Sequence, residues 1–127
     1  MYSEDDIRKF FSRRGEIELK LGVYRAQFHN REDSMPINMR ERIDQLERDL
    51  MTIDSLFHAL SANEKFVIQA HVIEQLDWPQ VLGEFVTRWG TDSEKTIRSL
   101  QVYQTKGLKK VANILNRYPD FESIGIK

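Results

Sequence analysis

The chain has 127 residues, enough for one domain with a single core, and 40% of them are hydrophobic against 31% charged. It contains no cysteine, which excludes disulfides and thiolate metal sites and fits a reducing cytoplasm. No apolar run approaches the roughly 20 residues that a membrane-spanning helix needs, so we expect a soluble cytoplasmic protein without a membrane partner.

The charge of the chain is unevenly distributed. The formal net charge is −1 and the pI is about 6.3, which argue against a protein that coats nucleic acid over its whole surface. Residues 93–118, however, hold six basic side chains against one acidic side chain, Glu94. A basic stripe on one segment is compatible with a local contact to phosphates.

The sequence predicts an all-α fold, because helical spacing dominates and turn signals are few. There are only six glycines and three prolines. The expected helices cover residues 3–28, 38–60, 61–75, 77–89 and 93–118, and residues 119–127 form a tail. Ser3, Ser61, Asp77 and Ser93 are the expected N-caps, with Glu64 completing a capping box after Ser61. A break of the first helix at Gly15 is an equal alternative to a continuous helix.

The first 60 residues predict an antiparallel helical hairpin. Apolar positions alternate spacings of three and four in both helices, which places them on two matched seams. The seams are Ile7, Phe10, Arg14, Ile17, Leu21, Tyr24 and Phe28, and Met39, Ile43, Leu46, Leu50, Ile53, Phe57 and Leu60. The hairpin either packs within one chain or makes a homodimer, and Gly15 and Gly22 would let a partner helix come close.

Residues 61–118 predict a three-helix domain whose last helix has two distinct faces. Its inner face holds Ile97, Leu100, Gln104, Leu108, Val111 and Leu115. Its outer face holds Lys95, Ser99, Val102, Lys106, Lys109 and Asn113, with Arg98 beside it. Such a face is either merely solvated or enters the major groove of double-stranded DNA.

In the DNA-binding interpretation, each residue of this face has a role set by its chemistry. Arg98 is the best candidate for a bidentate contact to guanine, while Lys95 and Ser99 could also reach base edges. Lys106, Lys109 and Lys110 lie farther along the helix and suit phosphates, which give affinity without sequence information.

The segment "LSANEKFVIQAHVIEQLDWPQVLGEF…SEKTIRSLQ…KGLKKVANIL" resembles region four of bacterial sigma factors, and more closely the phage late-gene transcriptional activators of the ArpU type. The resemblance covers about residues 60–116 and implies a helix-turn-helix, with Ser93, Lys95, Arg98 and Ser99 at the base-facing start of the recognition helix. It also implies a close helix crossing at Gly83 and contact with RNA polymerase. The "TRWGTD" turn is longer than in the compact motif.

No catalytic, cofactor or metal site is expected. His71 and Glu74 have a spacing that helical metal sites can use, but no second pair accompanies them. Trp78 and Trp89 fit a core better than a base-stacking platform. We therefore expect a transcriptional regulator of phage or prophage late genes. The alternatives are a phage small terminase subunit, which should form a large ring, and a helical interaction module or inhibitor that does not bind DNA.

Overall fold

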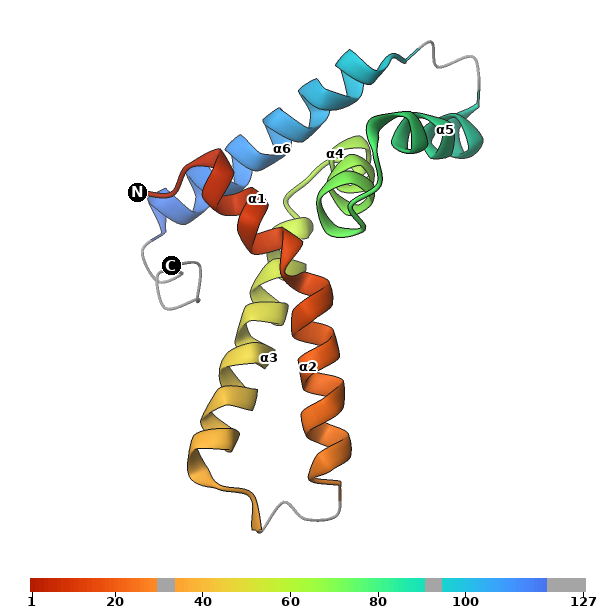
Figure 1. Ribbon diagram of the computed structural model, residues 1–127. Helices are drawn as coiled ribbons and strands as arrows, with labels where there is room; N and C mark the ends of the chain where they lie inside the picture. The colour runs from red at the N-terminus through yellow and green to blue at the C-terminus, as the bar shows by residue number, and fades with distance from the viewer. Residues whose placement is uncertain (30–33, 91–94, 119–127) are drawn as a thin grey trace.

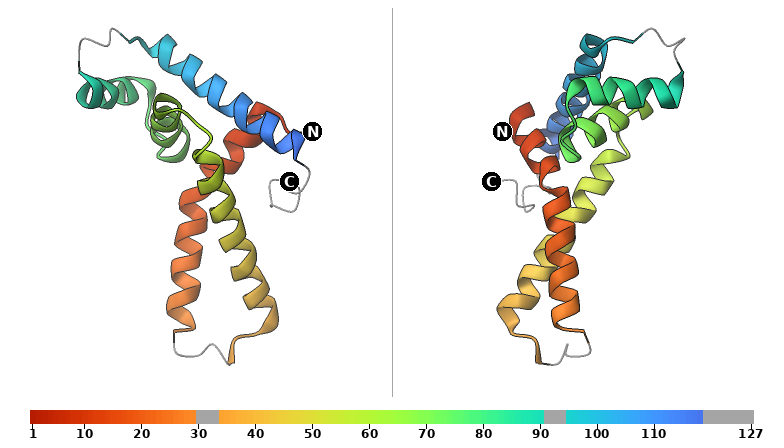
Figure 2. Two further views of the ribbon diagram at one scale, coloured as in Figure 1. Left: turned by 180° about the vertical axis from the view of Figure 1, so that it is seen from behind. Right: turned by 45° about the vertical axis from the view of Figure 1, so that its right-hand side comes forward.

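The structure, a computed structural model, is all-helical across the residues it describes, which are 1–29, 34–90 and 95–118. The predicted all-α class is confirmed. The elements are α1 (Glu4–Ser12), α2 (Arg14–Gln27), α3 (Ile37–Phe57), α4 (Ala62–Val67), the π-helix η2 (Ile68–Ile73), α5 (Trp78–Trp89) and α6 (Ile97–Arg117). Helices α2 and α3 form a stalk, and the other elements form a head at one end of it (Figures 1 and 2). No described helix has the length and apolar character that crossing a bilayer requires.

The first predicted helix is divided in two at Arg13, two residues before Gly15, where a break was the alternative to a continuous helix. Its start is as predicted, because Ser3 and Asp6 form a capping box. The division has a packing reason. Helix α1 packs against η2 and α6 in the head, whereas α2 runs along α3 in the stalk (Figure 1). A continuous helix could not serve both partners.

The stalk is the predicted antiparallel hairpin, and its inner seam packs within one chain. Ile17 and Leu21 of α2 and Ile43, Leu46 and Ile53 of α3 are all buried. Two ion pairs join the helices across the seam: Arg14 to Asp54 at 3.1 Å and Arg25 to Glu47 at 2.9 Å. Helix α3 ends at Phe57, three residues before the expected end.

In the head, α4 begins as the sequence predicts and then changes its hydrogen-bonding pattern. Ser61 and Glu64 form the expected capping box. From Ile68 the chain continues as a π-helix instead of the regular helix expected to residue 75. It ends at Ile73, and Gln75, two residues later, has a φ of +58°, which is unusual for a residue other than glycine. Such wide turns occur mainly as single turns and often lie near functional sites.

Helix α6 packs against different partners in its two halves. Leu100 lies in a small core with Val67, Ala70, Val81 and Phe85, which come from α4, η2 and α5. Leu108, Val111, Ala112 and Leu115 belong to the main core, which also contains Ile7, Phe10 and Phe11 of α1. Leu100, Leu108, Val111 and Leu115 of the predicted inner face are therefore buried, while Ile97 and Gln104 are half-buried. The predicted boundary between residues 60 and 61 stays a prediction, although the main core continues across it.

The close helix crossing lies at Gly107, not at Gly83. A Cβ atom built on Gly107 would lie 2.7 Å from Cδ1 of Ile68 and 3.4 Å from Cβ of Glu64. A Cβ on Gly83 would meet no atom within 4 Å. The expectation drawn from the family resemblance is therefore wrong, because Gly83 is on the exposed face of α5, opposite its buried residues Val81 and Phe85.

Candidate nucleic-acid interface

The start of α6 differs from the expected start. Its N-cap is Thr96, whose Oγ1 accepts a hydrogen bond from the Ser99 N–H at 3.2 Å, so the cap is not Ser93. Ser93 itself lies outside the described residues. Lys95 consequently precedes the helix, while Arg98 and Ser99 are the second and third residues of its first turn. Thr and Ser are both good caps, so the local sequence does not decide between them.

The first half of α6 has an exposed face opposite Leu100. Arg98 and Lys106 are exposed, and Val102 between them keeps 46% of its surface accessible. Neither cation forms an ion pair within the residues that the structure describes. Both therefore have donors available for an external anion or base.

The sequence interpretation missed two polar residues on this surface, Gln101 and Thr105, which are also exposed. They lie three and seven residues after Arg98, so helical spacing from Arg98 could have identified them. An amide can pair with adenine as a guanidinium pairs with guanine, and a hydroxyl can reach several bases or phosphates. Among the described elements, α4, η2 and α5 pack around Leu100 on the opposite side of this half of α6.

Two of the predicted contact residues are partly engaged within the chain. The Lys95 ammonium lies 5.3 Å from the centre of the Tyr103 ring, a cation–π distance. The Ser99 hydroxyl lies 3.2 Å from Thr96 Oγ1 and is half-buried in the cap. Their side chains are therefore less available to DNA than those of Arg98 and Lys106.

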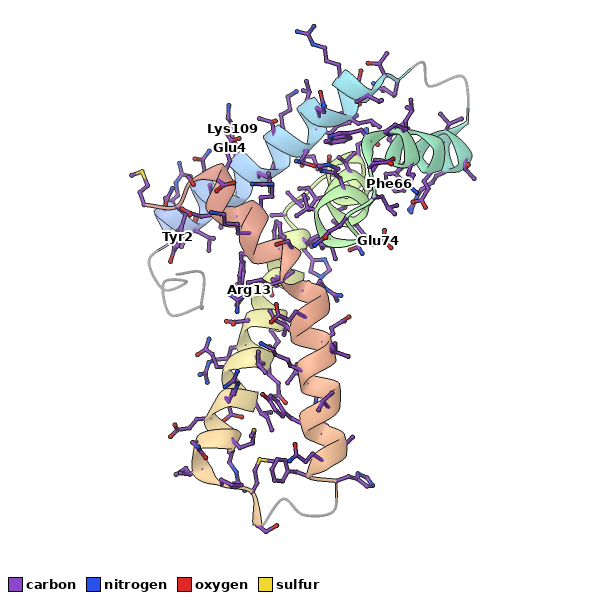
Figure 3. The ribbon with its side chains drawn as sticks, viewed as in Figure 1. Tyr2, Glu4, Arg13, Phe66, Glu74 and Lys109 are labelled. Atoms are coloured by element: carbon purple, nitrogen blue, oxygen red, sulfur yellow. The ribbon has the colours of Figure 1, made fainter. Side chains whose placement is uncertain are left out.

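The last two lysines of the predicted stripe point toward carboxylates of other helices. Lys109 lies 3.7 Å from Glu4 of α1, and both are labelled where α1 crosses α6 in Figure 3. Lys110 donates to Glu64 Oε1 at 2.8 Å, and the Glu64 side chain keeps only 8% of its surface exposed. Lys110 thus ties α6 to α4, a role that competes with the predicted phosphate contact.

The pKa of Glu64 depends on both its burial and its hydrogen bonds with Lys110 and Ser61. Burial raises the pKa of the Glu64 carboxyl, but hydrogen bonds from Lys110 and from the Ser61 N–H outweigh burial and lower the pKa below its ordinary value. The carboxylate therefore stays charged, and it joins the N-cap of α4 to the middle of α6.

The His71 side chain is held by contacts with neighbouring side chains of the protein. Its Nδ1 lies 2.7 Å from Gln104 Oε1, and its ring stacks on Trp78 with centroids 3.9 Å apart. Trp89 packs similarly against Phe66 and Phe85. No group of three potential metal ligands occurs among the described residues, so the spacing of His71 and Glu74 is not supplemented by a third ligand there.

An open hollow of about 520 Å³ lies between the end of α3, α4, η2 and α5. Phe57 and Phe66 give it aromatic walls, and Lys65 and Arg88 add positive charge at its edge. Arg88 lies over the Trp89 ring at 4.9 Å. Glu74 adds an acidic group to the same lining, so its charge is mixed.

The chain matches no protein-family model, no curated protein and no solved structure.

Proposed function

We propose that the chain is a sequence-specific DNA-binding transcriptional regulator that inserts the first half of α6 into the major groove. The observation that carries this proposal is the exposed face formed by Arg98, Gln101, Val102, Thr105 and Lys106, on a helix whose opposite face is anchored by Leu100. A major groove admits one α-helix, and the residues near the helix start reach base edges.

The chemistry of this face suits both kinds of DNA contact. A guanidinium can bond O6 and N7 of guanine, an amide can pair with adenine, and an exposed valine can contact the methyl group of thymine. Arg98 and Lys106 are the exposed cations of this half of the helix, and their charge favours contact with phosphates beside the groove. Helix α6 thus combines side chains for sequence reading with charge for affinity.

The biological setting that we propose is the activation of late genes of a phage or prophage, with RNA polymerase as the second partner and the cytoplasm as the location. This part rests on the resemblance of residues 60–116 to sigma region four and to ArpU-type activators. The regulator would bind a promoter-proximal site through α6 and hold polymerase through another surface.

The test is selection of DNA from a random duplex pool, followed by titrations at several salt concentrations. Arg98→Ala should relax the preference at one base pair by about 1–3 kcal/mol. Lys106→Ala should weaken binding to all sequences and reduce the salt slope by about one. Arg42→Ala is the matched control, because it removes one exposed cation from α3, far along the chain from α6.

The outcomes separate the proposal from its alternatives. If no motif is enriched even at low salt, and neither variant changes binding, α6 has a merely solvated face and the chain is an interaction module. A large ring that binds DNA would instead support the small terminase subunit.

A further inference from the structure

Helix α2 has a second apolar face, on the side opposite the seam that packs on α3. It consists of Gly15, Leu19, Gly22, Val23 and Ala26, all of which are exposed. Leu19 keeps 69% of its surface accessible and Val23 keeps 55%. We call these five residues the outer face of α2. No other element lies along this side of α2 in Figures 1 and 2.

The shape of the outer face suits another helix. Gly15, Leu19, Gly22 and Ala26 follow spacings of four, three and four, which is the pattern of a coiled-coil seam. A Cβ atom at Gly15 or at Gly22 would meet nothing within 4 Å, so both positions are open to an approaching backbone. Leu19 and Val23 would fill the space between the two close contacts. The inner seam is already occupied by α3, so a partner of the stalk must use another face.

The charges beside the outer face identify a second copy of this chain as the partner. Glu18 and Arg25 lie one heptad apart on the same flank of α2. A two-fold axis between Leu19 and Gly22 would place an antiparallel α2 opposite, with equivalent flanks facing each other. Glu18 of each copy would then face Arg25 of the other copy. A parallel pair would bring Glu18 to the flank that contains Val23 instead.

Both charged groups remain accessible for this exchange. Glu18 pairs with Arg14 and Arg25 pairs with Glu47, each at 2.9 Å within the chain. The Glu18 side chain nevertheless keeps 51% of its surface exposed and the Arg25 side chain keeps 62%. An exposed pair of this kind is weak and can be shared with a further charge.

We propose that the outer face of α2 is a homodimer interface, in which two stalks lie side by side with their α2 helices antiparallel. The two hairpins then form a four-helix arrangement, and the two heads lie at opposite ends. This interface does not depend on DNA binding and can be tested without DNA.

The first experiment is sedimentation equilibrium of the full chain, with Leu19→Glu and Met51→Glu compared. Met51 is the matched control, because it lies on α3 with the same 69% exposure. Leu19→Glu should raise the dimer Kd by at least about 100-fold, since each dimer loses two buried leucines and gains two buried charges. Met51→Glu should leave Kd unchanged. Circular dichroism should show that both variants keep their helices, because both positions are exposed.

The second experiment tests the antiparallel orientation by charge reversal. Glu18→Arg and Arg25→Glu should each raise Kd by about tenfold, because each puts like charges together twice. The double variant should return Kd to near the wild-type value, although it reverses the charges facing Arg14 and Glu47. A wild type that is monomeric at all concentrations or forms a ring, a Leu19→Glu variant that dimerises normally, or a double variant that stays weak would overturn the proposal.

Discussion

Replacing Lys110 by methionine should destabilise the fold in a way that depends on pH. The change removes the ammonium that lies 2.8 Å from Glu64 and leaves a carboxylate with 8% exposure and only its bond to the Ser61 N–H. Exposed ion pairs contribute about 0.2–1 kcal/mol, whereas hydrogen bonds to buried charged groups contribute about 1.5–3 kcal/mol. Because Lys110 itself is 42% exposed, we expect a loss of about 2 kcal/mol at pH 7.

The pH dependence follows from the lowered pKa of Glu64 in the folded chain. A carboxyl with a lowered folded pKa contributes stability above its unfolded pKa, near 4.5, and this contribution disappears as the pH falls through the folded value. In Lys110→Met, the hydrogen bonds with Ser61 still lower the pKa of Glu64, but the contribution of Lys110 against the effect of burial is lost. The difference in unfolding free energy between wild type and variant should therefore be largest near neutral pH and should shrink at acidic pH, where Glu64 becomes protonated first in the variant and then in the wild type.

The assay is urea denaturation of both proteins at pH 7, 5 and 3.5, with Lys109→Met as the control. Lys109 lies 3.7 Å from Glu4, and both side chains are exposed, so its replacement should change the unfolding free energy by less than about 0.5 kcal/mol. Equal effects of the two substitutions, or a Lys110→Met loss that stays constant with pH, would show that the Glu64 pair does not hold α6 to α4. If Lys110→Met instead reduces the salt dependence of DNA binding and leaves stability unchanged, Lys110 contacts a phosphate as first predicted.

Three further predictions concern two glycines and a helix cap. Gly107→Val should destabilise the chain by about 2 kcal/mol because its side chain enters the space held by Ile68, while Gly83→Ala should stabilise it by up to about 1 kcal/mol through helix propensity. Thermal denaturation measures both effects. A loss of stability in Gly83→Ala would support the close helix crossing that was expected at Gly83. Thr96→Ala should cost about 1 kcal/mol as the cap is lost. Urea titration checks this value, and an equal loss in Ser93→Ala alone would contradict the observed helix start.

Features that depend on neighbouring residues could be predicted from the sequence. The capping boxes at Ser3 and Ser61 and the cap at Asp77 each join groups three residues apart, so the local sequence determines them. The seams of α2 and α3 and the inner face of α6 follow from helical periodicity. The choice between Ser93 and Thr96 could not be made from the local sequence, because both residues are good caps.

Features that depend on contacts between distant segments could not be predicted. The division at Arg13 separates α1 and α2, which have different partners, and the glycine signal at Gly15 left it open whether the helix breaks. The π-helix has no signal in its sequence, "IQAHVI", that we can identify. Gly107 was identifiable in part, since it lies between Leu100 and Leu108 on the inner face of α6. The carboxylates that face Lys109 and Lys110 come from α1 and α4, so the local sequence could not show that these two lysines form ion pairs within the chain.

The packing of α6 also limits how much of it can enter DNA, and hence the length of the motif it can read. Helix α1 crosses its second half, where Tyr2 and Asn116 exchange two hydrogen bonds of 2.7 and 3.0 Å. The free part, residues 97–106, is about 15 Å long at 1.5 Å per residue. At about 3.4 Å per base pair, it spans roughly four to five base pairs.

Selection from a random pool should therefore enrich a short half-site rather than a long motif. If two copies also bind DNA as a two-fold dimer, the half-site should occur as an inverted repeat. Leu19→Glu should then keep the half-site but lose the repeat, whereas Arg98→Ala should lose the half-site. A continuous motif much longer than five base pairs would mean that α1 moves away from α6 on DNA, and the division of α6 into a reading half and a packing half would be wrong.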